Sequence, residues 1–306
     1  MGRLSAARTY AALHEGVVGL IVAADVVRVT GPDALSYLQG QVSQDLGTLA
    51  PGDSAETLVL SPQGKLDGYG RVARTGDETV CIVVDGGLGE AMLERLRRYK
   101  LRVAADLELV SWRALLLRGP AARPAASEVD AEISLEVDDP GFSGCDLVGP
   151  AVANPAGVAL GDPAGYEAAR IEAGVPVMGR ELTAKTIPQE AGLVPRAVSL
   201  TKGCYTGQEL VARLDARGNR VARRLVGFTV AFGTPAAGDT VVVAGGVVGS
   251  VTSVAYSPRT GGSVALGYLR RGTATPAPVE IVHDGSPCGA MATELPLWPG
   301  QGASRA

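Results

Sequence analysis

The chain has 306 residues, of which 46% are hydrophobic and 20% are charged, so it can build a substantial core in two or three domains. Its formal net charge of −4 argues against a protein that binds nucleic acid through bulk positive charge. The apolar runs are too short to span a bilayer, and the N-terminus lacks the order of a secretory signal. We therefore expect a cytoplasmic protein with neither a nucleic acid nor a membrane as its direct partner.

The first part of the chain alternates between strand and helix patterns. Short β-branched or apolar runs predict strands at 26–29, 57–60, 70–73, 79–84, 107–110 and 114–117. Amphipathic spacing predicts a helix at 90–99, and Thr30 can cap another helix that carries Leu35 and Leu38. This alternation, with its hairpins, predicts an α+β fold in which helices pack on mixed sheets.

The middle of the chain is less regular. Residues 120–160 are rich in Ala, Pro, Gly and acidic side chains, with short strand candidates near Ile133 and Leu147, and we interpret them as a variable surface region. A helix is predicted at 163–173, with Asp162 as its N-cap and Gly174 as its end. Residues 174–203 show little periodicity, and an irregular segment of that length inside a compact domain is usually functional.

After residue 220 the pattern changes to short β-rich runs that are separated by Gly and Pro turns. These runs lie at 225–230, 240–243, 247–254 and 263–269. They predict a small barrel of about five or six strands. We expect a body over 1–220, with subdomains of about 1–115 and 116–220, and a barrel over 221–306.

Cysteine and histidine are sparse in this chain. The four cysteines form no C-x-x-C pair, and His14 and His283 are the only histidines. A zinc or iron–sulfur site needs clustered ligands, so we expect no resident metal. Catalysis by a Ser-His-Asp or Cys-His arrangement is also poorly supported.

The most informative motif places a thiol between an ammonium and a phenol. It reads Lys202, Gly203, Cys204, Tyr205, Thr206, Gly207, Gln208 and Glu209. A neighbouring cation favours the reactive thiolate form of a cysteine, so Lys202 and Tyr205 could serve chemistry at Cys204. The alternative is that Cys204 is a small apolar filler, because most free cysteines are buried and inert. Local chemistry leaves both interpretations open.

Three other features carry charge in suggestive places. Asp67 follows the predicted hairpin turn and is either a carboxylate at the hairpin mouth or a solvated turn residue. Glu172 lies in the last turn of a predicted helix, where it opposes the helix dipole and calls for a partner. A run of arginines follows the motif and forms either an anion site or a solvated face. Its members are Arg213, Arg217, Arg220, Arg223 and Arg224.

The motif from Lys202 to Glu209, followed by Arg213, resembles that of the YgfZ family of folate-binding proteins. These proteins are relatives of the aminomethyltransferases, the T-proteins of glycine cleavage. Residues 28–45, 170–179 and 187–190 also resemble family segments, and 266–268 fit the terminal barrel. Matching segments in this order span roughly residues 26 to 270.

The resemblance implies a body around a central channel that binds tetrahydrofolate or a derivative. It also implies a role in the assembly or repair of iron–sulfur clusters in client enzymes, including tRNA-modifying ones. Glu172 matches a glutamate that resembles the pterin-recognising residue of the aminomethyltransferases, and a carboxylate suits that edge of the ring. The remaining cofactor-site candidates are Gly203, Gly207, Gln208, Glu209, Arg213 and Arg223, the arginines suiting an anionic tail.

The sequence departs from the aminomethyltransferase pattern in two ways. Asp67 is out of step with the family's catalytic aspartate, so we do not expect glycine-cleavage activity. Phenylalanine is scarce, so Tyr37, Tyr69 or Tyr205 would have to stack on a pterin.

Three hypotheses follow, and whether the chain is an enzyme stays open. Our preferred hypothesis is a folate-dependent iron–sulfur maintenance factor with a reactive Cys204. The second is a one-carbon transferase that uses Asp67 or Glu172 for acid–base chemistry. The third is a non-catalytic scaffold for a client enzyme, with folate as a structural ligand.

Overall fold

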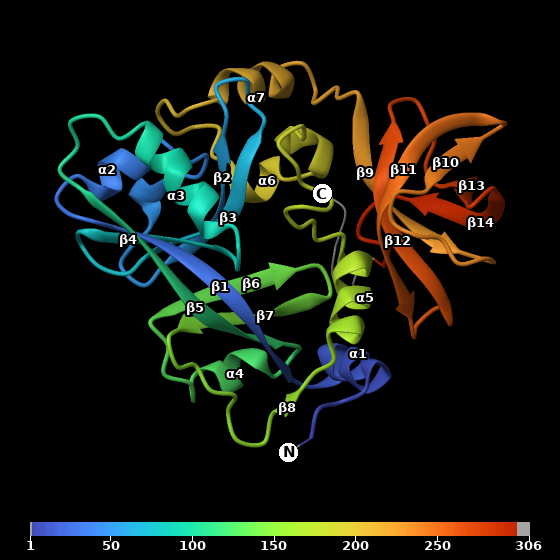
Figure 1. Cartoon of the computed structure of the whole chain (residues 1–306), viewed down its shortest axis with the longest axis horizontal. Helices are drawn as coiled ribbons and strands as arrows, with labels where there is room; N and C mark the ends of the chain where they lie inside the picture. Colours follow the sequence, from blue (N-terminus) through green and yellow to red (C-terminus); the bar gives the residue numbers. More distant parts are fainter. Residues whose placement is uncertain (1, 299–306) are drawn as a thin grey trace.

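A computed structural model of the chain describes residues 2–298 and shows a mixed α/β body followed by a β-barrel. Figure 1 shows the body on the left and the barrel on the right, with α1 and α5 between them. The helices are α1 (Ala6–Glu15), α2 (Ala34–Gln39), α3 (Gly89–Arg98), α4 (Ala122–Ala126), α5 (Pro163–Ala173), α6 (Val194–Ala197) and α7 (Gln208–Asp215). The 3₁₀ turns are η1 (Leu46–Thr48) and η2 (Pro188–Ala191).

The body is organised around a single mixed sheet. Its strands are β1 (Val18–Thr30), β2 (Ser54–Leu60), β3 (Leu66–Arg74), β4 (Thr79–Asp85), β5 (Asp106–Arg118), β6 (Ile133–Asp139), β7 (Phe142–Gly149) and β8 (Ala159–Leu160). Their order is β2-β3-β4-β1-β5-β7-β6, and β8 adds a short parallel pairing to β1. The expected fold class, with helices on mixed sheets, is confirmed.

One face of this sheet packs against α2 and α3 through a cluster that includes Val27, Leu38 and Leu96, each fully buried. The opposite face carries a second cluster around Val26, Ala114 and Leu135. Inward and outward side chains alternate along a strand, so β1 supplies Val26 to one face and Val27 to the other. The second face is the one that borders the cavity described below.

The helix predicted at 163–173 coincides with α5. Asp162 caps it by accepting a hydrogen bond from the backbone N–H of Ala164, and Gly174 ends it with φ +76°. The strand candidates near Ile133 and Leu147 coincide with β6 and β7, but both strands belong to the body sheet and not to a variable surface region, so that part of the prediction is wrong. Alternate residues of β6 are buried, as in a strand with one face on the core.

The C-terminal part is a closed barrel in the order β10-β11-β12-β9-β14-β13. The six strands are β9 (Arg223–Val230), β10 (Thr240–Val243), β11 (Gly246–Ser257), β12 (Gly262–Arg270), β13 (Ala277–His283) and β14 (Ser286–Thr293). Closure leaves no unpaired sheet edge and encloses Phe228, Val241 and Ile281, all of which are fully buried. A barrel of this size was predicted, but its last two strands were not located in the sequence.

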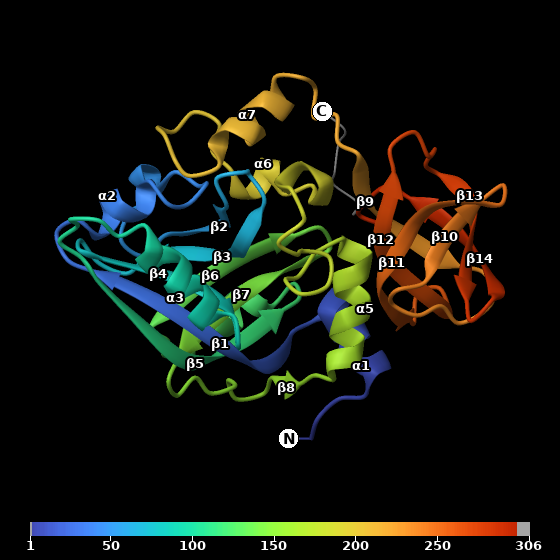
Figure 2. The ribbon, with the colours of Figure 1, turned by 45° about the horizontal axis from the view of Figure 1, so that its top comes forward.

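The irregular segment that follows α5 folds back over the body (Figure 2). It contains η2 and α6, and its Leu182, Leu193 and Ala197 pack on Leu58 and Leu66 of the β2–β3 hairpin. The expected subdomain boundary near residue 115 falls within β5, which pairs with both β1 and β7.

Candidate functional site

The body contains an open cavity between the sheet and the chain that follows α5. Its floor is formed by alternate residues on one face of the sheet, as with Ala114, Leu116 and Arg118 on β5. Tyr166 of α5 and residues 175–177 border it from the other side. The cavity has a volume of about 160 Å³ and opens to solvent.

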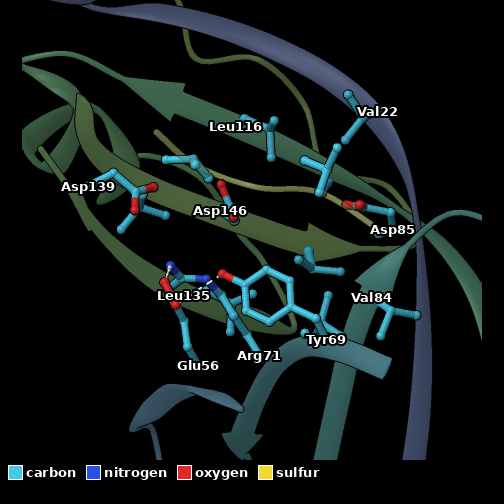
Figure 3. A pocket seen from close by; sticks show the side chains of 18 of the residues that line it. Val22, Glu56, Tyr69, Arg71, Val84, Asp85, Leu116, Leu135, Asp139 and Asp146 are labelled. Carbon is cyan, nitrogen blue, oxygen red and sulfur yellow. Dashed lines mark hydrogen bonds and ion pairs between the residues drawn. The ribbon is translucent and has the colours of Figure 1, made fainter. Parts of the chain in front are cut away.

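One wall of the cavity is a hydrogen-bonded charge network. Glu56 on β2 accepts a hydrogen bond from the Tyr69 hydroxyl at 3.0 Å, one from Arg71 at 2.9 Å and one from Arg196 Nε at 2.7 Å. Arg196 also pairs with Asp139 on β6. Figure 3 shows Glu56, Tyr69 and Arg71 together on one side of the cavity. These ion pairs neutralise Glu56 and Asp139 within the protein, so neither charge needs a ligand.

A second ion pair joins neighbouring strands of the floor. Arg118 on β5 lies 2.6 Å from Asp146 on β7. Burial alone would lower the pKa of Arg118. The neighbouring Asp146 carboxylate outweighs this effect, so the pKa of Arg118 lies above its ordinary value. Arg118 therefore keeps its charge and forms an ion pair with Asp146.

Asp85 at the end of β4 differs from the other acidic residues of the cavity. Among residues 2–298, Glu56, Asp139 and Asp146 all have an arginine partner, whereas the Asp85 carboxylate has no hydrogen bond or ion pair. Its surroundings raise its pKa, mainly through burial and then through repulsion from Asp146. The side chain is nevertheless accessible, which places a free carboxyl group at the cavity surface. Such a group can accept two hydrogen bonds from a ligand.

The cysteine motif lies outside this cavity. Lys202 does not direct its ammonium at the neighbouring thiol: Nζ donates to the carbonyl oxygens of Gln39, Val42 and Gln44 at 2.7, 2.8 and 2.8 Å. Three acceptors use all three donors of an ammonium. Burial lowers the pKa of Lys202 to about 8. In this structure the lysine anchors the motif to the turn after α2, which does not support the expected role as activator of Cys204.

The rest of the motif is fixed against the β2–β3 hairpin. Tyr205 is buried among Leu60 and Val211 with its backbone N–H bonded to the side chain of Gln208. Gly207 has φ +83°, and a Cβ there would lie 2.7 Å from the Cβ of Leu60.

Cys204 itself is exposed, in contrast to the buried Cys81, Cys145 and Cys288. The motif therefore holds one accessible thiol on a well-anchored loop. Gly203 beside it has open space around its α-carbon.

Glu172 is placed in the interface between body and barrel. One carboxylate oxygen accepts a hydrogen bond from the Tyr10 hydroxyl of α1, and the other accepts one from the Ser257 hydroxyl of β11. The residue is only 4% exposed and does not line the cavity. Glu172 thus has hydrogen-bond partners near the helix end, as we expected. The resemblance implied that its carboxylate faces a bound pterin, but its oxygens are directed at Tyr10 and Ser257 and not toward the cavity.

The other predicted charged residues also have partners outside the cavity. Asp67 accepts a hydrogen bond from Arg95 Nε at 2.7 Å, and Glu209 pairs with Arg213 on the exposed face of α7. Arg223 bonds Glu190 at 3.0 Å and lies over the ring of Tyr268. These contacts are typical of a structural ion-pair belt.

Of the three tyrosines considered for stacking, Tyr69 alone lines the cavity. Tyr37 is buried under α3, where it donates to the Leu96 carbonyl, and Tyr205 is in the hairpin cluster. The sequence reasoning missed most of the cavity's polar residues: Glu56, Arg71, Asp85, Arg118, Asp139, Asp146, Tyr166 and Arg196. Asp139 could have been recognised from the sequence. It continues the alternate, buried positions of Ile133, Leu135 and Val137, and a charged residue at such a position suggests a polar site.

Two features of the described residues bear on the class of protein. Residues 2–298 contain no group of three or more His, Cys, Asp and Glu side chains that could hold a metal ion. Within the same residues, none of the helices has the length and apolarity needed to cross a membrane.

Comparison with known families gives two matches along the chain. Residues 15–149 match the GCVT N-terminal domain. Residues 223–298 match the glycine cleavage T-protein C-terminal barrel domain. The two matches coincide with the body sheet and with the closed barrel.

Individual relatives fall into two groups. An uncharacterized protein of Haemophilus influenzae is 30% identical over 63% of this chain and 66% of its own length. The tRNA-modifying protein YgfZ of Klebsiella pneumoniae is 32% identical over 62% of this chain and 64% of its own. An aminomethyltransferase of Thermus thermophilus is 29% identical over 89% of this chain and 84% of its own. The matches to the first two thus span just under two thirds of those relatives.

A solved structure supports the fold. Aminomethyltransferase T of the Bartonella henselae glycine cleavage system superposes with a TM-score of 0.80, covering 96% of this chain and 90% of that protein. Sequence identity in this comparison is 20%.

Proposed function

Because this chain belongs to the glycine cleavage T-protein family as a YgfZ-like protein of the aminomethyltransferase fold, we propose that it binds a reduced folate in the body cavity. We further propose that it acts in the cytoplasm in the assembly or repair of iron–sulfur clusters of client enzymes. Those clients include tRNA-modifying enzymes, in keeping with the name of its YgfZ relatives. Exposed Cys204 is the residue that meets the client or its cluster.

The observation that carries the folate proposal is the free carboxyl group of Asp85 in the cavity. The 2-amino-pyrimidinone edge of a pterin presents two adjacent N–H donors, which match the two oxygens of one carboxylate. Tyr69 also lines the cavity and supplies an aromatic ring there. We assign pterin recognition to Asp85 rather than to Glu172, because both Glu172 oxygens already accept hydrogen bonds within the protein.

The position of Cys204 supports a role that is separate from folate binding. The thiol is exposed and does not line the cavity, whereas Tyr69 lines the cavity and packs against the hairpin cluster. Hydrogen bonds connect the two regions: Lys202 binds the Gln44 carbonyl, and the Gln44 side chain reaches the Arg196 carbonyl at 3.4 Å. A ligand in the cavity and a client at Cys204 can thus be bound at the same time.

Calorimetry with tetrahydrofolate tests the folate proposal directly. We expect Asp85→Asn to weaken binding about tenfold or more, because a charged hydrogen-bond acceptor is lost. Glu172→Gln is the matched control, since it alters a carboxylate outside the cavity, and Cys204→Ala should also retain affinity. Equal binding by Asp85→Asn and the wild-type protein would remove the basis for this assignment. Absence of binding by the wild-type protein would refute the folate proposal itself.

Thiol alkylation tests the part of the proposal that concerns Cys204. In the native protein we expect Cys204 to react well ahead of the buried Cys81, Cys145 and Cys288. Client activation should be lost in Cys204→Ala while folate affinity is kept. A Cys204→Ala protein that restores clients as well as the wild type would favour a scaffold role.

The one-carbon transferase is the weaker alternative in this structure. Its proposed acid–base residues, Asp67 and Glu172, are both held by protein partners outside the cavity. An Asp67→Asn variant with full turnover on any one-carbon donor would dispose of that mechanism.

A further inference from the structure

A positively charged surface extends from α7 to the rim of the barrel, where β9 begins and β12 ends. We call it the α7–barrel surface, and its exposed residues are Arg213, Arg217, Arg220, Val247, Arg270 and Arg271. Strand pairing places Arg270 opposite Arg223, and the backbone N–H of Arg271 donates to the Ala222 carbonyl at 2.8 Å. Figure 1 shows α7 above the β2–β3 hairpin, with the chain continuing from it to β9. Two segments that are distant in the sequence thus gather their arginines at one rim.

Most of these guanidinium groups have no acidic partner. The side chains of Arg217, Arg220 and Arg271 have no hydrogen bond or ion pair within residues 2–298. Arg270 donates to the Val247 carbonyl at 3.0 Å. Acidic residues beside these arginines are already engaged: Glu209 with Arg213, Glu190 with Arg223, Glu294 with Arg224 and Asp215 with Asn219. The surface therefore keeps a surplus of positive charge on a chain whose formal net charge is −4, and such a surplus attracts an anionic partner.

A groove of about 340 Å³ lies beside these charges at the barrel rim. β11 pairs with β12 from Gly249 onward, so Val247 and Val248 are separated from β12 and border the groove. Val247 is 52% exposed, and Leu200, in the loop that carries Cys204, is 51% exposed. Exposed apolar side chains on both sides of a charged surface are typical of a protein-binding surface.

The exposed thiol and the unpaired arginines lie at opposite ends of one short helix. Cys204 precedes α7, whereas Arg217 and Arg220 follow it. The eight residues of α7 span about 12 Å at 1.5 Å per residue. A protein that is bound at the barrel rim can therefore reach Cys204 within an interface of ordinary size.

We propose that the α7–barrel surface docks the client protein through an acidic segment that carries apolar side chains. Carboxylates of the segment pair with Arg217, Arg220 and Arg271, and an apolar side chain lies in the groove against Val247. The identity of this partner as the client rests on the proposed function, whereas the charge of the segment follows from the surface alone. A nucleic acid is also a polyanion, but bases stack on accessible aromatic rings, and Tyr268, the aromatic residue of the groove, is only 4% exposed.

Fluorescence anisotropy with the full chain tests the charge and the apolarity of the partner. The probes are a labelled peptide of alternating glutamate and leucine, the same peptide with glutamine in place of glutamate, and a polyuridylate of equal formal charge. We expect the glutamate peptide to bind most tightly, and its affinity to fall as added salt shortens the Debye length. Equal binding of the glutamine peptide would overturn the proposal. Tighter binding of the polyuridylate would also overturn it and would indicate a nucleic-acid surface instead.

Variants locate the binding on this surface. Arg220→Gln/Arg271→Gln removes two guanidinium groups without a partner in residues 2–298, so the fold should be kept. It should weaken binding of the glutamate peptide about tenfold and flatten the salt dependence, since each exposed ion pair contributes about two- to fivefold. Val247→Ser should weaken it about threefold through the loss of an apolar contact. Arg3→Gln/Arg8→Gln is the matched control, because both arginines are exposed near the N-terminus. If the first double variant binds the peptide like this control, the proposal is refuted.

Restoration of an iron–sulfur tRNA-modifying enzyme separates docking from the chemistry at Cys204. In Arg220→Gln/Arg271→Gln, the amount of protein that gives half-maximal restoration should rise about tenfold while the maximum stays unchanged. Cys204→Ala should instead lower the maximum. A double variant that restores the enzyme at wild-type concentrations would contradict the proposal. A wild-type protein that restores no enzyme overturns the proposed function, and the peptide measurements then decide the docking surface independently.

Discussion

Replacing Lys202 with methionine separates an anchoring lysine from one that activates a thiol. Methionine keeps a similar length but leaves the carbonyls of Gln39, Val42 and Gln44 without their shared donor. Hydrogen bonds to a charged donor contribute about 1.5–3 kcal/mol each when buried. Lys202 is half-buried and its desolvation opposes part of this gain. We therefore expect the free energy of unfolding to fall by about 2–4 kcal/mol in total.

Chemical denaturation and hydrogen exchange measure this effect. Lys185→Met is the matched control, because Lys185 is exposed and its side chain has no partner among residues 2–298. Amides in segments 39–44 and 199–206 should exchange faster in Lys202→Met alone. Lys202→Arg should not restore stability, since a planar guanidinium cannot reach three convergent carbonyls. If Lys202→Met unfolds like the control but alkylates Cys204 more slowly, the lysine activates the thiol and our reasoning is wrong.

Two further predictions concern the cavity and the motif. Asp85→Asn should raise stability at neutral pH by up to about 1 kcal/mol after allowance for solvent screening, because burial and Asp146 disfavour the ionised form. The stability difference between Asp85→Asn and the wild type is complete above the raised pKa of Asp85. It should vanish in denaturation curves measured below the ordinary pKa range of an aspartate, and a difference that does not change with pH would contradict this prediction. Gly207→Ala should destabilise the protein by about 1–3 kcal/mol, since φ is +83° and a Cβ would overlap the hairpin, whereas Gly203→Ala should have little effect on thermal unfolding. Equal thermal stability of the two alanine variants would show that the β2–β3 hairpin shifts to accommodate the added Cβ, against our prediction.

Elements with strong local signals could be predicted from the sequence. The helix at 163–173 had a capping aspartate before it and a glycine after it, and both act within a few residues. Strands β6 and β7 were recognised only as short candidates near Ile133 and Leu147, because Gly, Pro and acidic residues surround them in the sequence. Asp139 lies in the buried phase only because Arg196, 57 residues away in the chain, neutralises it.

The candidate site depended even more on distant contacts. Cys204 was recognised as the central residue of its motif, and its exposure agrees with a reactive role that awaits a test. The contacts of Lys202 could not be predicted, because adjacency in sequence does not determine the direction of a long side chain. The carbonyls that hold it come from residues some 160 positions earlier. Asp85 had no motif around it, and only the folded sheet shows that it lacks a partner.

The Glu172 contact has a consequence for the order in which the chain folds. Of the two hydroxyl groups that donate to its carboxylate, that of Tyr10 is synthesised before Glu172, whereas that of Ser257 is synthesised 85 residues after it. Leu297 then returns to donate its N–H to the Glu172 carbonyl at 2.8 Å. Until the barrel is made, the carboxylate in a nascent body must stay in contact with water, because an unpaired charge is costly to bury. The helix pair α1–α5 should therefore complete its packing only after translation has passed the last strand.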